Sequence, residues 1–191
     1  MLRILRFLAE IVRKLKFPNN SNIKSDSAVI GNFTRGDISR LFAQRTEETG
    51  QNITKEALEY VWEQSRGQPW IVNSLFSRAT MRVPDEESRE TVTLGHVQES
   101  RRQMILARET HLDSLAYRLE DPGIRKVIEA LMVGEPDPCL AEGEGFHLCE
   151  DLGLVTMERG TPVVANPIYR EILARQMTFG IQAATPEPEW Q

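Results

Sequence analysis

Cysteine and aromatic residues are scarce in this sequence, which has two cysteines and 7% aromatic residues among 191 positions. Two cysteines are too few for a disulfide scaffold and are typical of proteins of the reducing cytosol. Cys139, His147 and Cys149 lie close together in the chain, but a zinc site needs four ligands, usually paired at short spacings. We therefore predict a cytoplasmic protein without a metal site, in which Cys149 is a core residue and Cys139 lies in a loop.

The sequence also lacks the motifs of common enzyme sites. It contains no G-x-x-x-x-G-K-[ST] phosphate loop. The histidines His96, His111 and His147 have no serine or cysteine with a neighbouring acid that would form a triad. His111 and Asp113 are better explained as the polar face of a helix. We predict no catalytic residue in this chain, which is therefore expected not to be an enzyme by itself.

An excess of positive charge is missing as well, since the formal net charge is −5. This balance excludes a polycation that coats nucleic acid, whereas 40% hydrophobic and 27% charged residues are typical of a globular protein with one domain or two small ones. The charge is unevenly distributed. Against the single acid Glu10, the first 24 residues contain Arg3, Arg6, Arg13, Lys14, Lys16 and Lys24.

Residues 1–17 form a basic amphipathic segment. Its apolar residues recur at helical spacing, at Leu5, Leu8, Ile11, Val12 and Leu15. Basic residues interrupt the apolar run too often for a spanning helix, which needs about 20 apolar residues, and no signal-peptide cleavage site follows. Two interpretations remain: a helix that lies on a membrane surface, or a terminal helix that packs on a neighbouring domain. We favour the second.

The middle of the chain predicts a series of helices. Thr34 with Asp37 forms a capping-box pattern, and Gly50 ends the helix that follows. Thr54 begins the next helix, and Gly67 ends it because a residue just past a helix often needs a positive φ. Pro69 then opens a third helix at the position where its missing N–H costs nothing.

The later part of the chain predicts a different arrangement. Thr93 caps a long helical stretch that carries Val97, Met104, Leu112, Leu115 and Leu119. A helix runs from Pro122 to Gly134, and a short helix covers about residues 144–152. Two β-like runs around a glycine turn predict a hairpin near 154–166, and Asn166 with Pro167 begins a last helix. This order, helices followed by a hairpin and a helix, is that of a winged-helix module.

The ordered segments resemble a known family. Residues 29–75, with "NFTRGD" before one helix and "RGQPW" between the next two, look like the part that follows the P-loop core in bacterial AAA-like ATPases of the STAND and archaeal-ATPase kind. The segments "RETHLDSLAYRLEDPGIRKVIEALMVGE", "EDLGLV" and "VVANPIYREIL" look like the C-terminal portion of that family. The resemblance covers about residues 22–177 and implies a small helical lid followed by a winged helix.

The resemblance also implies a nucleotide-contacting surface. In that family a Gly-x-Pro turn lies over the base and ribose of the bound nucleotide, and here the turn is Gly67, Gln68 and Pro69. A glycine allows close approach of the backbone, and the proline ring is an apolar surface without an N–H. Two interpretations of Trp70 remain: it extends this surface, or it is a packed core residue. The second is the more common role of a tryptophan in the first turn of a helix. ATP or ADP is implied as a ligand of the family, and no cofactor is expected for this chain in isolation.

The chain departs from the family at the P-loop core. That core would lie before residue 22, so Walker A, Walker B and the catalytic sheet are absent. We expect a natural truncation, a split gene product or a fragment of a longer ATPase. Such a chain would contact nucleotide only together with a P-loop core, or otherwise act through another protein domain. The alternative function is a winged-helix DNA-binding regulator. The acidic candidate recognition helix disfavours it, because Glu142, Glu144, Glu150 and Asp151 would repel phosphate and only Arg159 marks the wing.

The expected fold class is mainly α: a helical lid bundle followed by a winged-helix domain with one small β-hairpin. The predicted division has four parts. They are the basic N-terminal segment 1–28, the helical lid domain 29–100, the winged-helix domain 101–179 and a Pro-rich disordered tail 180–191.

Overall fold

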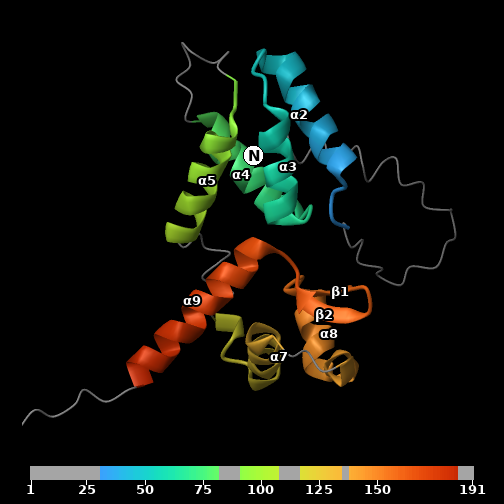
Figure 1. Cartoon of the computed structure of the whole chain (residues 1–191), viewed down its shortest axis with the longest axis vertical. Coiled ribbons are helices and arrows are strands. Elements are labelled where there is room, and N and C mark those ends of the chain that lie inside the picture. The colour runs from blue at the N-terminus through green and yellow to red at the C-terminus, as the bar shows by residue number, and fades with distance from the viewer. Residues whose placement is uncertain (1–30, 82–90, 108–116, 135–137, 185–191) are drawn as a thin grey trace, which may run out of the picture.

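The computed structural model describes residues 31–81, 91–107, 117–134 and 138–184. Within these ranges the protein is mainly helical, with one two-stranded antiparallel sheet (Figure 1). This confirms the predicted fold class, a helical bundle with a small hairpin. The basic N-terminal segment 1–28 and residues 185–191 lie outside the described residues.

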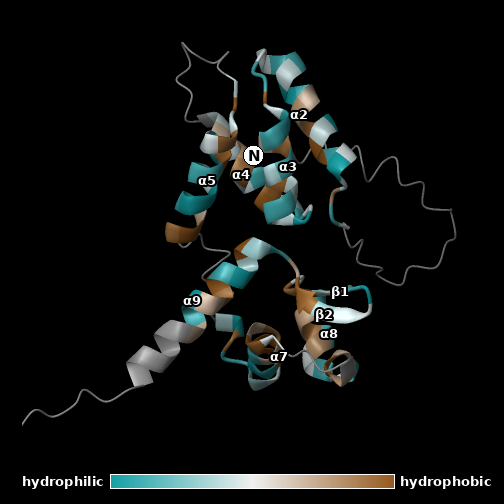
Figure 2. Ribbon diagram, viewed as in Figure 1, coloured by the Kyte–Doolittle hydropathy of each residue, from teal (hydrophilic) through white to brown (hydrophobic). Residues whose placement is uncertain are grey.

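Helix α2 (Arg35–Thr49) begins and ends where local chemistry predicts. The Thr34 side chain accepts a hydrogen bond from the Asp37 N–H, and the Asp37 carboxylate accepts one from the Thr34 N–H. These hydrogen bonds hold the pKa of Asp37 below its ordinary value. Gly50 ends the helix at φ 73°. The helix is mostly hydrophilic (Figure 2) and is held by two buried residues, Ile38 and Phe42.

Three further helices complete the N-terminal bundle: α3 (Lys55–Ser65), α4 (Pro69–Met81) and α5 (Leu94–Leu106). The Thr54 hydroxyl caps α3 and Pro69 is the first residue of α4, as predicted. A parallel bridge between Ile53 and Val92 ties together the segments that lead into α3 and α5. Helix α5 packs against both α3 and α4.

The helix predicted after Thr93 is shorter than expected. Thr93 is the N-cap of α5 as predicted, but the helix ends at Leu106 with Ala107 as C-cap. Ala107 keeps a right-handed backbone, with φ −73° and ψ −4°, so this helix end does not need a glycine. The sequence therefore lacks the glycine or proline that usually marks the end of a helix. Leu112 and Leu115, like His111 and Asp113, lie outside the described residues. Leu119 is buried just before the next described helix.

The C-terminal unit contains a hairpin between helices. Its elements are α7 (Pro122–Val133), the 3₁₀ turn η2 (Pro138–Glu142), α8 (Glu144–Asp151), β1 (Val155–Glu158), β2 (Thr161–Val164) and α9 (Pro167–Ala184). The strands pair antiparallel with Val155 opposite Val164, around the turn at Arg159 and Gly160. The predicted hairpin near 154–166 is therefore confirmed. Asp121 caps α7 and Asn166 caps α9 through side-chain oxygens.

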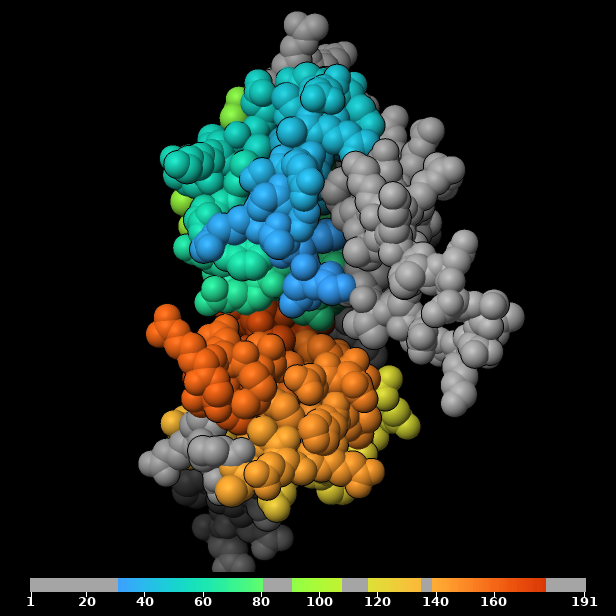
Figure 3. All heavy atoms as spheres, turned by 90° about the vertical axis from the view of Figure 1, so that its right-hand side faces the viewer, coloured from blue at the N-terminus to red at the C-terminus, as the bar shows by residue number. Residues whose placement is uncertain are grey.

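One continuous hydrophobic core runs through both units. In the N-terminal bundle its centre is α4, where Ile71, Val72 and Leu75 are fully buried. In the C-terminal unit Phe146 and Tyr169 are the largest buried side chains. The space-filling view shows the two units in contact, one above the other (Figure 3). The N-terminal half of α9 lies at this contact, against α3 and α5 (Figure 1).

The predicted domain division stays a prediction, but two of its boundaries fall inside helices. The boundary between residues 100 and 101 lies within α5, and residue 180, the predicted start of the tail, lies within α9. Hydrophobic periodicity and turn residues place a helix more reliably than they place a domain border within a continuous core.

Candidate functional site

The turn between α3 and α4 is formed by two consecutive residues with left-handed backbone. Arg66, the C-cap of α3, has φ 49°, and Gly67 has φ 80°. The Gly67 carbonyl accepts a hydrogen bond from the Phe33 N–H at 2.8 Å. A Cβ built on Gly67 would lie 2.0 Å from the Phe33 carbonyl oxygen. The glycine therefore allows a close approach, and the group that approaches it here is the backbone of the segment leading into α2.

Gln68 reaches from this turn to the C-terminal unit. Its side-chain oxygen accepts a hydrogen bond of 2.7 Å from the Asn166 amide. Its Nε2 lies 3.2 Å from the position a Cβ would take on Gly153, in the bend between α8 and β1. Asn166 is itself buried, and its Oδ1 accepts a hydrogen bond from the Tyr169 N–H at 2.8 Å. Gln68 thereby contacts the residue that caps α9.

Trp70 makes the neighbouring contact. Its indole N–H donates a 2.8 Å hydrogen bond to the Tyr169 hydroxyl, and the two rings stack with centroids 6.3 Å apart. Burial raises the pKa of Tyr169 to about 12, against hydrogen bonds with Trp70 and Gln68 that lower it. Tyr169 is therefore neutral at physiological pH. We call Gln68, Trp70, Asn166 and Tyr169 the polar joint.

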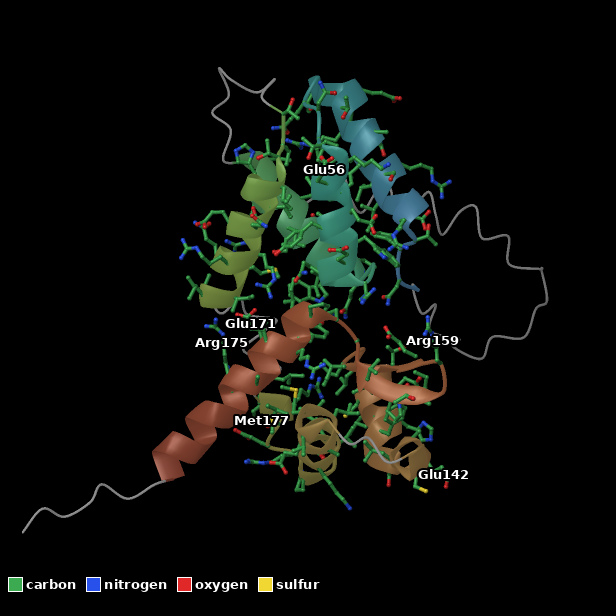
Figure 4. The ribbon with its side chains drawn as sticks, viewed as in Figure 1. Glu56, Glu142, Arg159, Glu171, Arg175 and Met177 are labelled. Carbon is green, nitrogen blue, oxygen red and sulfur yellow. The ribbon has the colours of Figure 1, made fainter. Side chains whose placement is uncertain are left out.

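An ion pair supports the polar joint from α5. Arg101 Nη2 lies 2.5 Å from a carboxylate oxygen of Glu171, and Arg101 Nε donates to Gln64 at 2.7 Å. Burial raises the pKa of Glu171, but the hydrogen bonds and charges of Arg101 and Arg175 outweigh burial and hold it below its ordinary value. Figure 4 shows Glu171 and Arg175 on α9, below the end of α5. Glu171 is therefore charged at neutral pH and links α5 to α9.

The structure thus shows where the predicted site residues lie. Gly67 is buried against Phe33, Gln68 and Trp70 bond to α9, and Pro69 is half-buried at the start of α4. Between the two interpretations of Trp70, its contacts are those of a packed, hydrogen-bonded residue within the chain. Nucleotide contact by these residues remains a prediction. Sequence reasoning identified Asn166 as a cap but missed its bond to Gln68, because the two residues are 98 positions apart.

The residues considered for metal binding do not come together. Cys139 is exposed and Cys149 is buried, and no group of three potential metal ligands occurs in the described part of the chain. His147 Nδ1 lies 3.9 Å from a Glu150 oxygen on the exposed side of α8. No helix within the described ranges is both long and apolar enough to cross a membrane.

The two cysteines should differ strongly in reactivity. Burial, with a smaller effect of the charge on Asp121, raises the pKa of Cys149 to about 11. Because the thiolate is the reacting form, Cys149 should stay unmodified at pH 8. We expect one equivalent of iodoacetamide to react with the folded chain, at the exposed Cys139, and two after unfolding. Peptide mass spectrometry reads the site, and early labelling of Cys149 would contradict its burial.

Comparison with known proteins gives few matches. No family model matches the sequence, and no curated protein matches it. Among solved structures, the Holliday junction branch migration motor RuvB of Thermotoga maritima matches with 15% identity and a TM-score of 0.38, covering 75% of this chain and 50% of that one. A structure of a mutant of the same protein matches with 15% identity and a TM-score of 0.37, covering 75% and 49%.

The chain thus spans about half the length of these two structures. A TM-score below 0.5 at this identity assigns neither a family nor an activity.

Proposed function

We propose that this chain is a non-catalytic lid and winged-helix module of an AAA-like, STAND-type ATPase, working with a separate P-loop core or another protein domain. The observation that carries the proposal is the position of the corner Gly67–Trp70. It ends one helix, begins the next and bonds to α9 of the C-terminal unit through Gln68 and Trp70. A partner that contacts this corner would act on both units at once.

The polar joint suits such a coupling role. Asn166 and Tyr169 are buried, Gln68 and Trp70 are half-buried, and each named hydrogen bond is between 2.7 and 2.8 Å long. Buried polar groups that are fully bonded fix one arrangement, because any other arrangement leaves a donor or acceptor without a partner. The joint therefore sets the direction of α9 relative to α4. Pro69, half-buried between Gln68 and Trp70, is the part of the corner best able to meet a nucleotide held by a separate core.

The DNA-binding alternative has less support. In a winged-helix reader, α8 would enter the groove, yet Glu144, Glu150 and Asp151 on this helix are exposed. The hairpin turn offers a single cation, the exposed Arg159 (Figure 4). Phosphate contacts supply most non-specific affinity for DNA, so an acidic helix weakens binding at every sequence. We therefore favour protein interaction over nucleic acid.

The proposal predicts no ATP hydrolysis by the isolated chain. Phosphoryl transfer needs groups that hold Mg²⁺ and the γ-phosphate, and the sequence contains no phosphate loop to do so. We expect phosphate release no faster than in a buffer blank, measured with a coupled assay at millimolar ATP. Turnover that stays proportional to this chain through several purification steps would refute the proposal.

Pro69→Ala tests the corner as a nucleotide surface. Alone, the chain should bind ADP in the millimolar range or not at all, because an apolar contact without phosphate ligands yields about −4 kcal/mol. Together with a P-loop core, binding should become tight. Pro69→Ala should then weaken it by roughly fivefold, because the lost ring contact is on the order of 1 kcal/mol. Isothermal calorimetry with ADP measures both states.

The matched control is Pro122→Ala, which removes a proline from the same helical position in α7. It should leave ADP affinity unchanged. Equal affinities for wild type, Pro69→Ala and Pro122→Ala in the presence of the core would mean that the corner only connects helices.

A further inference from the structure

Helix α8 presents an acidic outer face. Glu144, His147, Leu148 and Asp151 follow one another at steps of three, one and three residues, so they share one side of the helix, and all four are exposed. The opposite side carries Phe146 and Cys149, which are buried. Glu150 is also exposed, on the flank of the helix next to His147, and α8 therefore exposes three carboxylates, two of them on the same side as Leu148. We call the five exposed residues Glu144, His147, Leu148, Glu150 and Asp151 the acidic face.

The carboxylates of the acidic face are not neutralised within the described part of the chain. There, Glu144, Glu150 and Asp151 form no ion pair with lysine or arginine, and a Glu150 carboxylate oxygen lies 3.9 Å from His147 Nδ1. Glu150 and Asp151 also occupy the last turn of α8, where the helix dipole adds partial negative charge. Two like charges at a helix C-terminus are unfavourable unless a cationic partner covers them.

A basic partner exists in the same chain. Residues 1–17 hold five arginines and lysines at positions 3, 6, 13, 14 and 16, interleaved with leucine, isoleucine and valine at helical spacing. This pattern complements a helix that exposes three carboxylates, two of them beside Leu148.

The described chain begins close to the acidic face. The Phe33 N–H bonds to the Gly67 carbonyl, and the next residue, Gln68, reaches Gly153. Gly153 follows α8 by two positions, and its N–H donates to the Glu150 carbonyl at 2.8 Å. Residues 31–33 therefore lie a few side chains away from the C-terminal end of α8.

The connecting segment is long enough. Residues 18–30 span up to about 45 Å when extended, whereas α8 is about 12 Å long. A short tether of this kind gives an effective concentration on the order of millimolar, so even a weak intrinsic affinity would keep the segment bound.

From these observations we propose that residues 1–17 dock on the acidic face of α8 within the same chain. Arginines and lysines of the segment pair with Glu144, Glu150 and Asp151, and its apolar residues cover Leu148. The docked segment conceals its basic residues from anionic surfaces, so membrane attachment and docking on α8 exclude each other. This inference is independent of the proposed ATPase partnership, because it concerns only this chain.

Zero-length carbodiimide cross-linking of the full chain tests the proposal. It joins an amine to a carboxylate in direct contact, so Lys14 or Lys16 should link to Glu150 or Asp151 within one chain. Raising the salt from about 0.05 to about 1 M shortens the screening length to roughly 3 Å and should reduce the yield at least threefold. Mixing ¹⁴N- and ¹⁵N-labelled protein distinguishes links within a chain from links between chains.

Charge reversal makes the test specific. Glu150→Lys with Asp151→Lys should abolish the link. Adding Lys14→Glu with Lys16→Glu should restore a link between the same two segments, with the amines now on α8 and the carboxylates in residues 1–17. The matched control reverses Glu47 and Glu56, exposed residues of α2 and α3, and should leave the link intact. Figure 4 shows Glu56 at the far end of the molecule from Glu142, which precedes α8. Links only between chains, links insensitive to the reversal, or no links at all would each overturn the proposal.

Discussion

Gly67→Ala should lower the free energy of unfolding by about 3–5 kcal/mol. A left-handed backbone costs a non-glycine residue roughly 1–2 kcal/mol. The added Cβ would also lie 2.0 Å from the Phe33 carbonyl oxygen, and this neighbour is backbone, which moves only if the whole segment moves. That movement breaks the Phe33–Gly67 hydrogen bond, worth about 1 kcal/mol, and partly exposes the buried Phe33 ring.

Gly50→Ala is the matched control for this prediction. Gly50 has φ 73°, close to that of Gly67, but a Cβ on Gly50 would meet no atom within 4 Å. Gly50→Ala should lower the free energy of unfolding only by the cost of a left-handed backbone in alanine, about 1–2 kcal/mol. Urea denaturation followed by circular dichroism measures both variants. If they are destabilised equally, the close approach of Phe33 has no energetic importance.

Local signals explain why the helix borders of this protein are largely predictable. Thr34 with Asp37, and Asp121 ahead of Pro122, satisfy free N–H groups within three residues of themselves. Gly50 and Gly134 end helices with left-handed backbone that few other residues adopt. Such interactions depend on neighbours in sequence and can be read without a structure.

The candidate site was predictable only in part, because its partners are distant in sequence. The pattern Gly67-Gln68-Pro69 indicates a corner, and the positive φ of Gly67 follows from it. The reason for that glycine is the backbone of Phe33, and the role of Gln68 depends on Asn166. Neither contact leaves a periodic or compositional signal. The end of α5 at Leu106 was missed for a related reason, since Ala107 is an ordinary helix former.

The apolar core and the hydrogen bonds of the polar joint contribute to the contact between the two units in different ways. The continuous core holds the two units together through close packing, and a single apolar contact has little directional preference. The bonds of Gln68 to Asn166 and of Trp70 to Tyr169 are directional. Removing a hydroxyl from the joint should thus change orientation more than it changes packing.

Tyr169→Ala should be among the most destabilising substitutions in the chain, at about 3–5 kcal/mol. Tyr169 has 0% exposure, so its removal leaves a large cavity at the contact between the units. It also removes the hydroxyl that accepts a hydrogen bond from the half-buried Trp70 indole N–H. Tyr117→Ala, at an exposed tyrosine with 72% exposure, is the control and should change stability by no more than about 0.5 kcal/mol.

Tyr169→Phe isolates the hydroxyl from the ring. It keeps the packing and removes the hydroxyl that accepts from the Trp70 indole N–H, so we expect a loss of about 1 kcal/mol, the usual net contribution of one hydrogen bond. Trp70→Phe removes the indole N–H that forms the other half of this bond. In a double-mutant cycle, Tyr169→Phe and Trp70→Phe should show a coupling energy of about 1 kcal/mol, because the second substitution removes a bond that the first has already broken. Urea melts give the four free energies. Strict additivity of Tyr169→Phe and Trp70→Phe would mean that the 2.8 Å bond between these side chains contributes nothing to the joint.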